Sequence, residues 1–441
     1  MRNFIAIFWS LAGAWPAQAQ FTLTTNNGAI TIAQYTGAGG MVTIPSSTNG
    51  YPVTTIGTNA FYGLTNLSGV TIPDSVTDIE VEAFAECPGL ADVTIPDRVT
   101  TVGAGAFVDC IGLTNVTIGS SVVTIGDEAF DYTGLRNVTI PDSVTTIGVD
   151  VFDASGLTNV TIGASVTSIS AGAFRYCPLT SVTIPNSVTN ICGYAFYQCE
   201  SLARVTIGSG VSSVGDSAFE YCGSLTNLVV DAANPNYASA GGVLFDQSMT
   251  ALIQFPKGLT GGYVIPSRVT SIGEMAFKEC LGLTNVTIPR SVTSIGAGAF
   301  AYSGLVAAYF QGNAPLVDGG PGSADTSVFY GDSFHGGPGT AYYLSGTTGW
   351  GATFGGWPTA PWYQSKPQIL GSTVGLGALT HQFGFTVSWA TNSYLVIETC
   401  TNPAGPVWTP LATNVPVNGT VTFSDPQWSD YPSRYYRLKT P

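Results

Sequence analysis

One pattern of apolar and polar positions recurs through most of the chain, and residues 283–300, LTNVTIPRSVTSIGAGAF, show it clearly. Aligning its copies on one phenylalanine column gives spacings of mostly 22 or 23 residues. The column is formed by Phe61, Phe84, Phe107, Phe130, Phe152, Phe174, Phe196, Phe219, Phe277 and Phe300. A fixed period of this length predicts a solenoid, in which short structural units are stacked on one another.

Each unit predicts a small set of elements. In Val116-Thr117-Ile118 apolar residues flank a polar one, which indicates a short strand with one buried face. A proline such as Pro141 ends this strand in sister units, because proline offers no N–H to a neighbouring strand. A glycine such as Gly148 marks a second turn. We therefore expect a strand, a turn, a short strand or turn, and a short helical turn around the phenylalanine.

One unit alone buries too few side chains to offset the conformational entropy lost when its backbone is ordered. Stacked units share their apolar columns and pair their strands along the axis, so stability belongs to the array and the ends need capping. The predicted fold class is mainly β. We expect a parallel-sheet solenoid of 22–23-residue units, followed by a small antiparallel β-sandwich-like C-terminal domain.

The repeated residues resemble the BspA-like leucine-rich repeats of bacterial surface proteins, whose units read like AFxxCxxLxxVxIPxSVxxIGxxAF. The resemblance covers about residues 30–305. It departs from the commoner leucine-rich repeat, because Pro followed by Ser-Val stands near the Asn position of LxxLxLxxNxL. The resemblance implies a leucine-rich-repeat solenoid with a protein-binding or adhesive role, and it implies no catalytic residues.

The segments outside the regular repeats extend or close the array. Trp350, Trp357 and Trp362 are predicted to cover its last open edge, since an uncovered edge would invite end-to-end association. In chain order, the predicted parts are an N-terminal cap with imperfect repeats at residues 20–60, the repeat solenoid at 61–305 with an irregular unit at 228–266, a C-terminal cap of the solenoid at 306–364, and a small β-sandwich-like domain at 365–441.

Two of these parts predict antiparallel pairing. The irregular unit contains a predicted hairpin, with strands at 243–245 and 251–255. After a linker at 365–367, the last domain alternates apolar and polar residues in short strands, similar in pattern to immunoglobulin-like or fibronectin type III modules. These strands are predicted at residues 383–389, 394–398, 421–423 and 434–438.

Residues 1–19 have the features of an export signal. Arg2 precedes an apolar run, and Ala17-Gln18-Ala19 matches an A-x-A cleavage site. We expect a signal peptide at 1–19 and a mature N-terminus at Gln20. No later apolar run is long enough to span a membrane. The sequence thus predicts a secreted protein, extracellular or at the cell surface, without a transmembrane segment.

The charge balance argues against nucleic-acid partners. The chain has 13 Lys and Arg against 27 Asp and Glu, for a formal net charge of −14. So few cations cannot form the basic stripe that neutralises phosphates. Anionic membranes are disfavoured for the same reason.

Six of the 8 cysteines share one column, three residues after the repeat phenylalanine. They are Cys87, Cys110, Cys177, Cys199, Cys222 and Cys280. Leu, Ser and Thr replace them in other units, which favours buried thiols that fill space. Disulfides between adjacent units are the alternative, because strand spacing and an oxidising compartment both allow them.

No motif for catalysis, a metal or a cofactor stands out. The chain lacks a nucleophile elbow, a phosphate-binding loop and a zinc-protease motif, and its histidines, His335 and His381, have no evident partner. The sequence does not give the distance between two carboxylates, so it does not decide whether a pair is placed for glycoside hydrolysis. Asp97 and Asp142 follow prolines in repeat turns, where turn preference explains them. We expect no enzyme, no cofactor and no metal site.

The candidate partner-binding surface is a column of threonines that point outward from the main sheet, often with asparagine two residues earlier. Such an uncharged surface would suit a protein partner on an extracellular matrix or host surface. The alternative is a carbohydrate ligand held by exposed aromatic rings of the cap or the C-terminal domain. The candidate threonines are Thr71, Thr94, Thr117, Thr139, Thr161, Thr183, Thr206 and Thr287.

Overall fold

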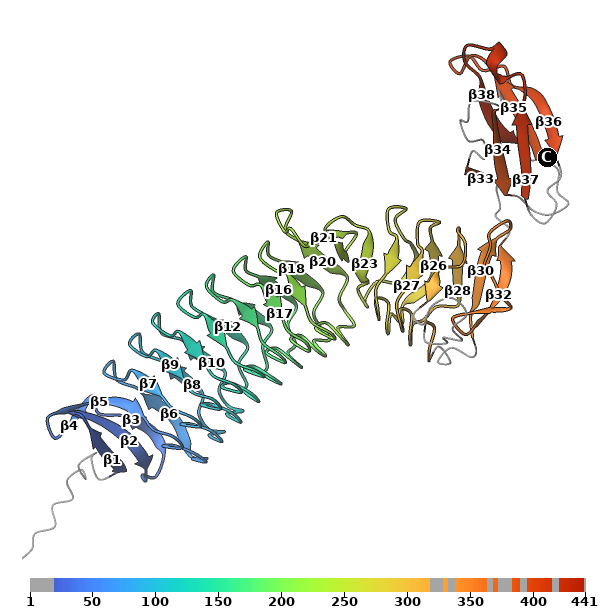
Figure 1. Ribbon diagram of the computed structural model, residues 1–441. Coiled ribbons are helices and arrows are strands. Elements are labelled where there is room, and N and C mark those ends of the chain that lie inside the picture. Colours follow the sequence, from blue (N-terminus) through green and yellow to red (C-terminus); the bar gives the residue numbers. More distant parts are fainter. Residues whose placement is uncertain are drawn as a thin grey trace, which may run out of the picture. The chain divides into compact units, whose positions relative to one another are not determined.

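The computed structural model describes residues 20–317, 328–331, 338–362, 368–371, 383–388, 395–414 and 420–439 (Figure 1). The predicted signal peptide at 1–19 and the predicted linker at 365–367 lie outside these ranges. The chain divides into two compact units, Met1–Gly242 and Val243–Pro441. The described residues form strands and turns, with no α-helix among them. None of them lies in a helix that could cross a membrane.

The first unit begins with a hairpin that covers the edge of the stack. β1 (Phe21–Asn26) pairs antiparallel with β2 (Ala29–Tyr35), and β2 pairs parallel with β5 (Tyr51–Ile56). The first coil is completed by β3 (Gly40–Thr43) and β4 (Ser47–Thr48). Because β1 occupies the outer side of β2, the first parallel strand is not left as an open edge.

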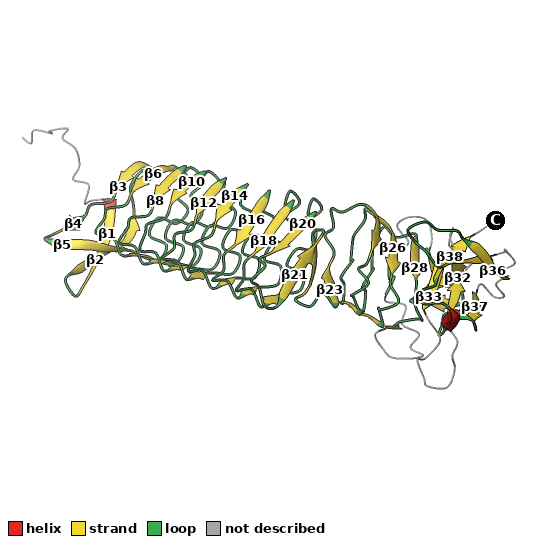
Figure 2. Ribbon diagram, turned by 90° about the horizontal axis from the view of Figure 1, so that it is seen from above, coloured by secondary structure: helices red, strands yellow, loops and turns green. Residues whose placement is uncertain are grey.

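Each following coil contributes one longer and one two-residue strand (Figure 2). Where strands of adjacent coils are paired, as in β8 with β10 and β9 with β11, the pairing is parallel and in register. The longer strands are β6 (Leu67–Thr71), β8 (Asp92–Thr94), β10 (Asn115–Thr117), β12 (Asn137–Thr139), β14 (Asn159–Thr161), β16 (Ser181–Ile184), β18 (Arg204–Ile207) and β20 (Asn227–Val230). The short strands are β7 (Asp78–Ile79), β9 (Thr101–Val102), β11 (Thr124–Ile125), β13 (Thr146–Ile147), β15 (Ser168–Ile169), β17 (Asn190–Ile191) and β19 (Ser213–Val214). β21 (Tyr237–Ala240) follows in the irregular unit.

The predicted phenylalanine column is the centre of the core. From Phe61 to Phe219 the rings are fully buried and stacked, with centroids 4.8–5.6 Å apart and planes within 19° of parallel. Tyr35 extends the stack to the N-terminal hairpin, 5.3 Å from Phe61. Since each ring contacts its neighbours in both adjacent coils, the array carries a continuous aromatic core that no single coil could bury.

The predicted short helical turn around each phenylalanine is wrong. Residues two before and two after it, such as Glu82 and Glu86 around Phe84, have positive φ values of 52° and 54°. A right-handed helical turn excludes such values. Alternate amides bond to the next coil instead: Phe84 N–H donates to Ala106 O at 2.8 Å and Glu86 N–H to Val108 O at 2.8 Å. The segment is therefore a turn that pairs along the axis.

The Pro-Asp turns link successive coils. The Asp97 carboxylate accepts the Ser120 amide at 2.8 Å, and the Asp142 carboxylate accepts the Ala164 amide at 2.7 Å. The hydrogen bonds from Ser120, chiefly the one from its backbone amide, lower the pKa of Asp97. The aspartates thus hold the following coil in place, in agreement with the structural role that the sequence predicts.

The column cysteines are buried thiols, and none is in a disulfide. The thiol of Cys110 donates to Phe84 O at 3.1 Å, and Cys87, Cys177 and Cys199 make the equivalent bond to the phenylalanine one coil back. Burial raises the pKa of Cys177 to about 12. Each of these thiols fills space in the core and donates a hydrogen bond to one carbonyl oxygen. The prediction of buried thiols is therefore the one that the structure favours over disulfides.

The second unit begins with the predicted hairpin and then forms parallel coils of its own. β22 (Val243–Asp246) and β23 (Ala251–Gln254) pair antiparallel, which confirms that prediction. The parallel strands that follow are β24 (Gly261–Val264), β26 (Leu283–Ile288), β28 (Ala307–Phe310), β30 (Thr340–Leu344) and β32 (Trp357–Trp362), with β31 (Thr353–Phe354) folded back antiparallel onto β32. The short strands are β25 (Ser271–Ile272), β27 (Ser294–Ile295) and β29 (Leu316–Val317).

A second aromatic stack runs through this unit and ends on tryptophan. Phe255, Phe277, Phe300 and Phe329 stack with centroids 4.7–5.4 Å apart. The Trp357 ring lies 4.1 Å from Phe329, within 14° of parallel, and is 2% exposed. Its indole closes the stack with a larger apolar surface than a phenylalanine would offer.

The last residues form two small antiparallel sheets. One consists of β33 (Gln368–Gly371), β34 (Phe383–Ser388) and β37 (Thr420–Asp425), and the other of β36 (Thr409–Asn414), β35 (Leu395–Cys400) and β38 (Tyr435–Lys439). Phe385, Val387, Leu395, Ile397 and Phe423 form their shared core. The mainly β fold class, with a parallel solenoid and a sandwich-like C-terminal part, is confirmed.

Candidate functional site

The structure places seven of the eight candidate threonines in one straight row on the longer strands of the first unit. Register pairs Thr94 with Thr117, Thr139 with Thr161, and Thr183 with Thr206. Six of the seven side chains are exposed and Thr206 is half-buried. The inward residues between them, such as Val116 and Val138, belong to the core. We call this outward surface of strands β6 to β18 the threonine face.

A second row runs beside the threonines, two residues earlier on each strand. Its asparagines come together from β10, β12 and β14, and the Asn159 side-chain amide donates to the Asn137 side-chain oxygen at 3.1 Å. Asp92 and Arg204 stand in the same row towards its two ends. The middle of the face is therefore uncharged and offers hydroxyls and amides at one spacing per coil.

Thr287 does not join this row. It lies on β26 in the second unit, where register places it between Val264 and Tyr309. In the first unit the row ends where Val229 pairs with Thr206. The column that the sequence presents as continuous is therefore divided between the two units.

The outward row of the second unit turns aromatic after Thr287. Tyr309 and Tyr342 pair in register, and their rings stack at 5.1 Å and 15°. Trp362 lies 5.0 Å from Tyr309. All three side chains are half-buried. Sequence reasoning missed the two tyrosines, although their positions in Ala307–Phe310 and Thr340–Leu344 follow from the period-two alternation.

The tryptophans proposed as sugar platforms differ in what they expose. Trp357 is buried in the core and offers no face to a ligand. Trp350 packs between Phe310 and Tyr343, and its indole N–H donates to Thr347 Oγ1 at 2.9 Å. Trp362 lies beside the outward row: register continues the row from Tyr342 to Ala360, and Trp362, two residues further along β32, contacts Tyr309.

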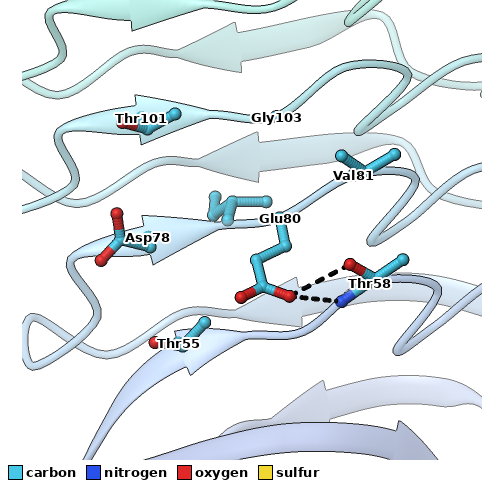
Figure 3. A pocket seen from close by; sticks show the side chains of 8 residues that line it. Thr55, Thr58, Asp78, Glu80, Val81, Thr101 and Gly103 are labelled. Carbon is cyan, nitrogen blue, oxygen red and sulfur yellow. Dashed lines mark hydrogen bonds between the residues drawn. The ribbon is translucent and has the colours of Figure 1, made fainter.

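A recess of about 520 Å³ opens beside the short strands β7 and β9 (Figure 3). Its lining includes two carboxylates, and neighbours bind both of them. Glu80 folds back onto Thr58, whose amide and hydroxyl donate at 2.9 and 3.1 Å. Asp78 accepts the Thr77 hydroxyl at 2.8 Å. The Glu80 contacts join adjacent coils, so this carboxylate has a structural role.

The chain matches the BspA type leucine rich repeat region in 6 copies, over residues 54–178, 167–261 and 260–315. This match spans more than half of the chain. The chain belongs to the BspA-type leucine-rich repeat family. BspA-type repeat proteins are repeat scaffolds of bacterial cell surfaces, and leucine-rich repeat proteins generally bind other proteins.

Several solved structures are similar to this BspA-type chain. A leucine rich cell surface protein from Faecalibacterium prausnitzii has 27% identity and a TM-score of 0.48, over 75% of this chain and 88% of that one. The T. pallidum leucine rich repeat protein has 30% identity and a TM-score of 0.38, over 48% and 91%. A leucine-rich repeat protein from Bacteroides ovatus has 20% identity and a TM-score of 0.43, over 76% and 94%. No curated protein matches the chain.

The BspA-type coils have a further surface, the turn face, formed by the segments from two residues before to two residues after each stacked phenylalanine. In the first unit this face is rich in carboxylates. Burial and the neighbouring Asp153 raise the pKa of Asp131 to about 7, with smaller contributions from Glu128 and Asp109. Burial also raises the pKa of Asp150, although the Arg175 guanidinium lies 3.5 Å away and opposes the shift. In the described part of the chain, no cluster of three acidic, His or Cys side chains is arranged to hold a metal.

The raised pKa of Asp131 predicts a specific pH dependence. In the folded protein this carboxyl keeps its proton up to about pH 7, whereas in the unfolded chain it releases the proton near pH 3.9. The folded state therefore binds more protons between these values, so its stability falls as the pH rises from about 4 to about 7. We expect Asp131→Asn to raise the thermal midpoint relative to the wild type at pH 8 but not at pH 4.

Calorimetry at the two pH values measures this difference. The control is Asp92→Asn, which removes an exposed carboxylate from the threonine face. A variant Asp131→Asn that is no more stable than the wild type at pH 8 would show that this carboxyl does not limit stability.

Proposed function

We propose that this protein is a secreted, non-catalytic scaffold that binds a protein partner through the threonine face, as an adhesin does on a host surface or an extracellular matrix. The observation that carries the proposal is the in-register row of exposed threonines beside the asparagine row. The row repeats one chemistry over successive coils, so many weak hydrogen bonds can form along an extended partner.

Membership of a family of bacterial surface scaffolds supports this proposal. The export signal that the sequence predicts at residues 1–19 supports secretion. The strongly acidic composition disfavours binding to anionic membranes. The identity of the partner, a protein of a host surface or an extracellular matrix, is part of the same proposal.

A carbohydrate ligand is the second candidate, and one observation favours it. The stacked rings of Tyr309 and Tyr342 on the outward row of the second unit, with Trp362 beside Tyr309, form an aromatic strip. Flat aromatic surfaces of this kind stack on sugar rings. Thr287 and Asn285 on the adjacent strand β26 could donate hydrogen bonds to the same ligand.

The test replaces Thr117, Thr139 and Thr161 together by lysine. The side chains are exposed, so the fold should persist, while three ammonium groups impose desolvation and steric costs on any partner that docks there. We expect binding to a panel of immobilised purified matrix proteins, measured by surface plasmon resonance, to weaken at least about tenfold.

The matched control carries three lysines in the same coils on another surface, at Val123, Thr145 and Thr167, which are also exposed. It adds the same charge but should bind as the wild type does. Equal affinities for the two triple variants would contradict the threonine face as the site. Two results together would favour the carbohydrate candidate. Tyr342→Ala would abolish the binding of the protein to a glycan array, and the triple threonine variant would bind matrix proteins as the wild type does.

A further inference from the structure

The turn face of the first unit gathers acidic side chains that lie far apart in the sequence. The segments around four consecutive stacked phenylalanines, EVEAFAEC, GAGAFVDC, GDEAFDY and GVDVFDA, contain no lysine or arginine. Their carboxylates on the turn face are Glu82, Glu86, Asp109, Glu128, Asp131, Asp150 and Asp153, and Glu80 and Asp127 lie just before it in the sequence. Because the rings beneath them are 5.2–5.5 Å apart, carboxylates of adjacent coils are held closer together than a Debye length in physiological salt.

Residues with positive φ occupy equivalent positions in successive coils, so their side chains form columns on this face. Glu82 and Glu128 precede their phenylalanine by two residues, and Glu86 and Asp109 follow theirs by two. Each has φ between 52° and 58°, and the inter-coil hydrogen bonds of the same segments fix these backbones. The acidic side chains are thus presented by a rigid ladder and not by loops.

Two buried oxygens of this face lack a donor. The Oδ1 atoms of Asp131 and Asp153 accept no hydrogen bond from any residue that the structure describes. Asp153 is only 4% exposed, and its other oxygen pairs with Arg175. A buried carboxylate oxygen without a donor is costly, and the negative potential of the Asp153 oxygen adds to the attraction of this face for a cation at its surface.

Exposed tyrosines continue the same face beyond Arg175. Tyr176, Tyr194 and Tyr221 are 47%, 51% and 44% exposed, and Tyr197 joins them at ring distances of 5.9, 5.5 and 5.3 Å. Tyrosine rings attract ammonium and guanidinium groups through their faces. The molecule itself shows this contact, since the Arg175 guanidinium lies 5.6 Å from the Tyr176 ring centroid.

From these observations we propose that the turn face of the first unit, from Glu82 to Tyr221, docks a lysine- or arginine-rich extended segment of a partner protein. Charge complementarity selects the cations, and the tyrosines give their side chains aromatic surfaces at one end. The coils from Phe84 to Phe219 span roughly 30 Å, which corresponds to about nine or ten residues of extended chain at ~3.3 Å per residue. This site is separate from the threonine face and selects different chemistry.

The test measures fluorescence anisotropy of a labelled decapeptide of alternating lysine and serine titrated with the full-length protein at low salt. The turn-face variant carries Glu82→Gln, Asp109→Asn and Glu128→Gln. Glu82 is half-buried, Asp109 and Glu128 are exposed, and each replacement keeps the size of the side chain. We expect this variant to bind the peptide at least tenfold more weakly than the wild type.

The control separates a local site from attraction by the net charge of −14. It carries Asp74→Asn, Asp92→Asn and Glu200→Gln, three exposed acids outside the turn face, and loses the same total charge. We expect its affinity to stay within about twofold of the wild type. Thermal midpoints of both variants establish that each is folded.

A third arm tests the tyrosines. With a peptide of alternating arginine and serine, Tyr194→Ala should weaken binding several-fold, whereas a glutamine-serine peptide should not bind the wild type. Equal losses for the two triple variants would overturn the proposal, since binding would then follow net charge alone. Absence of any binding to the lysine peptide at 50 mM salt would overturn it as well.

Discussion

Replacing Phe152 by alanine is expected to lower the free energy of unfolding by about 3–5 kcal/mol, the range for a fully buried phenylalanine. Its ring lies between those of Phe130 at 5.5 Å and Phe174 at 5.6 Å. Removing it leaves a cavity, and both neighbouring rings lose their packing contact on that side. Because each coil contacts only its neighbours, the loss interrupts the array in its middle.

Hydrogen exchange followed by mass spectrometry should locate the effect. Amides of β12 and β14, which flank the lost ring, should exchange much faster, while those of β7 and β9 change less. The control is Tyr132→Ala, at a side chain 54% exposed, which should cost only about 0.5 kcal/mol. Equal stabilities of the two variants would show that the ring stack does not hold the coils together.

Replacing Trp357 by alanine should have an effect of similar size, about 3–5 kcal/mol, but at the end of the second unit. The indole covers Phe329 at 4.1 Å and packs against Gly339, where an added Cβ would lie 2.5 Å from the ring. Its loss exposes the last ring of the stack to water. Strands β28 and β30 should then exchange faster.

Trp428 supplies the matched control, because it is also a tryptophan but is 39% exposed. Trp428→Ala should leave exchange in β28 and β30 unchanged. If Trp357→Ala also leaves it unchanged, the indole is not what closes this stack.

Much of the fold could be predicted from the sequence, because a solenoid repeats its rules. The phenylalanine column, the alternation around Val116 and Val138, and the hairpin of β22 and β23 all follow from spacing. In the C-terminal part, β33 and β36 were not predicted. β36 contains Pro410, which weakens the strand pattern in sequence.

The helical turn was wrong for a physical reason. Segments such as EAFAEC have the composition of a helix, and their local propensity favours one. Pairing with the next coil overrides that propensity, since Phe84 N–H donates to Ala106 O and not within its own turn. A bond between residues 22 positions apart has no local signature.

Only part of the candidate site could be predicted from the sequence. The threonine row follows from period and alternation, but its division before Thr287 depends on the irregular unit. The turn face escaped notice because its columns mix Glu86, Asp109 and Tyr132, which share no residue type. Their combined charge exists only once the coils are stacked, so it could be read from the structure and not from any single repeat.

The column of thiols gives the array its own set of chemical reporters. Each buried thiol, from Cys87 to Cys222, belongs to a different coil and bonds to the coil before it. A thiol so placed can be alkylated only when its coil separates from that neighbour. The order in which these cysteines react would therefore record which coils open first, with the half-buried Cys192 as the accessible reference. Local opening of the solenoid could be followed coil by coil through its own cysteines, without introducing a reporter residue.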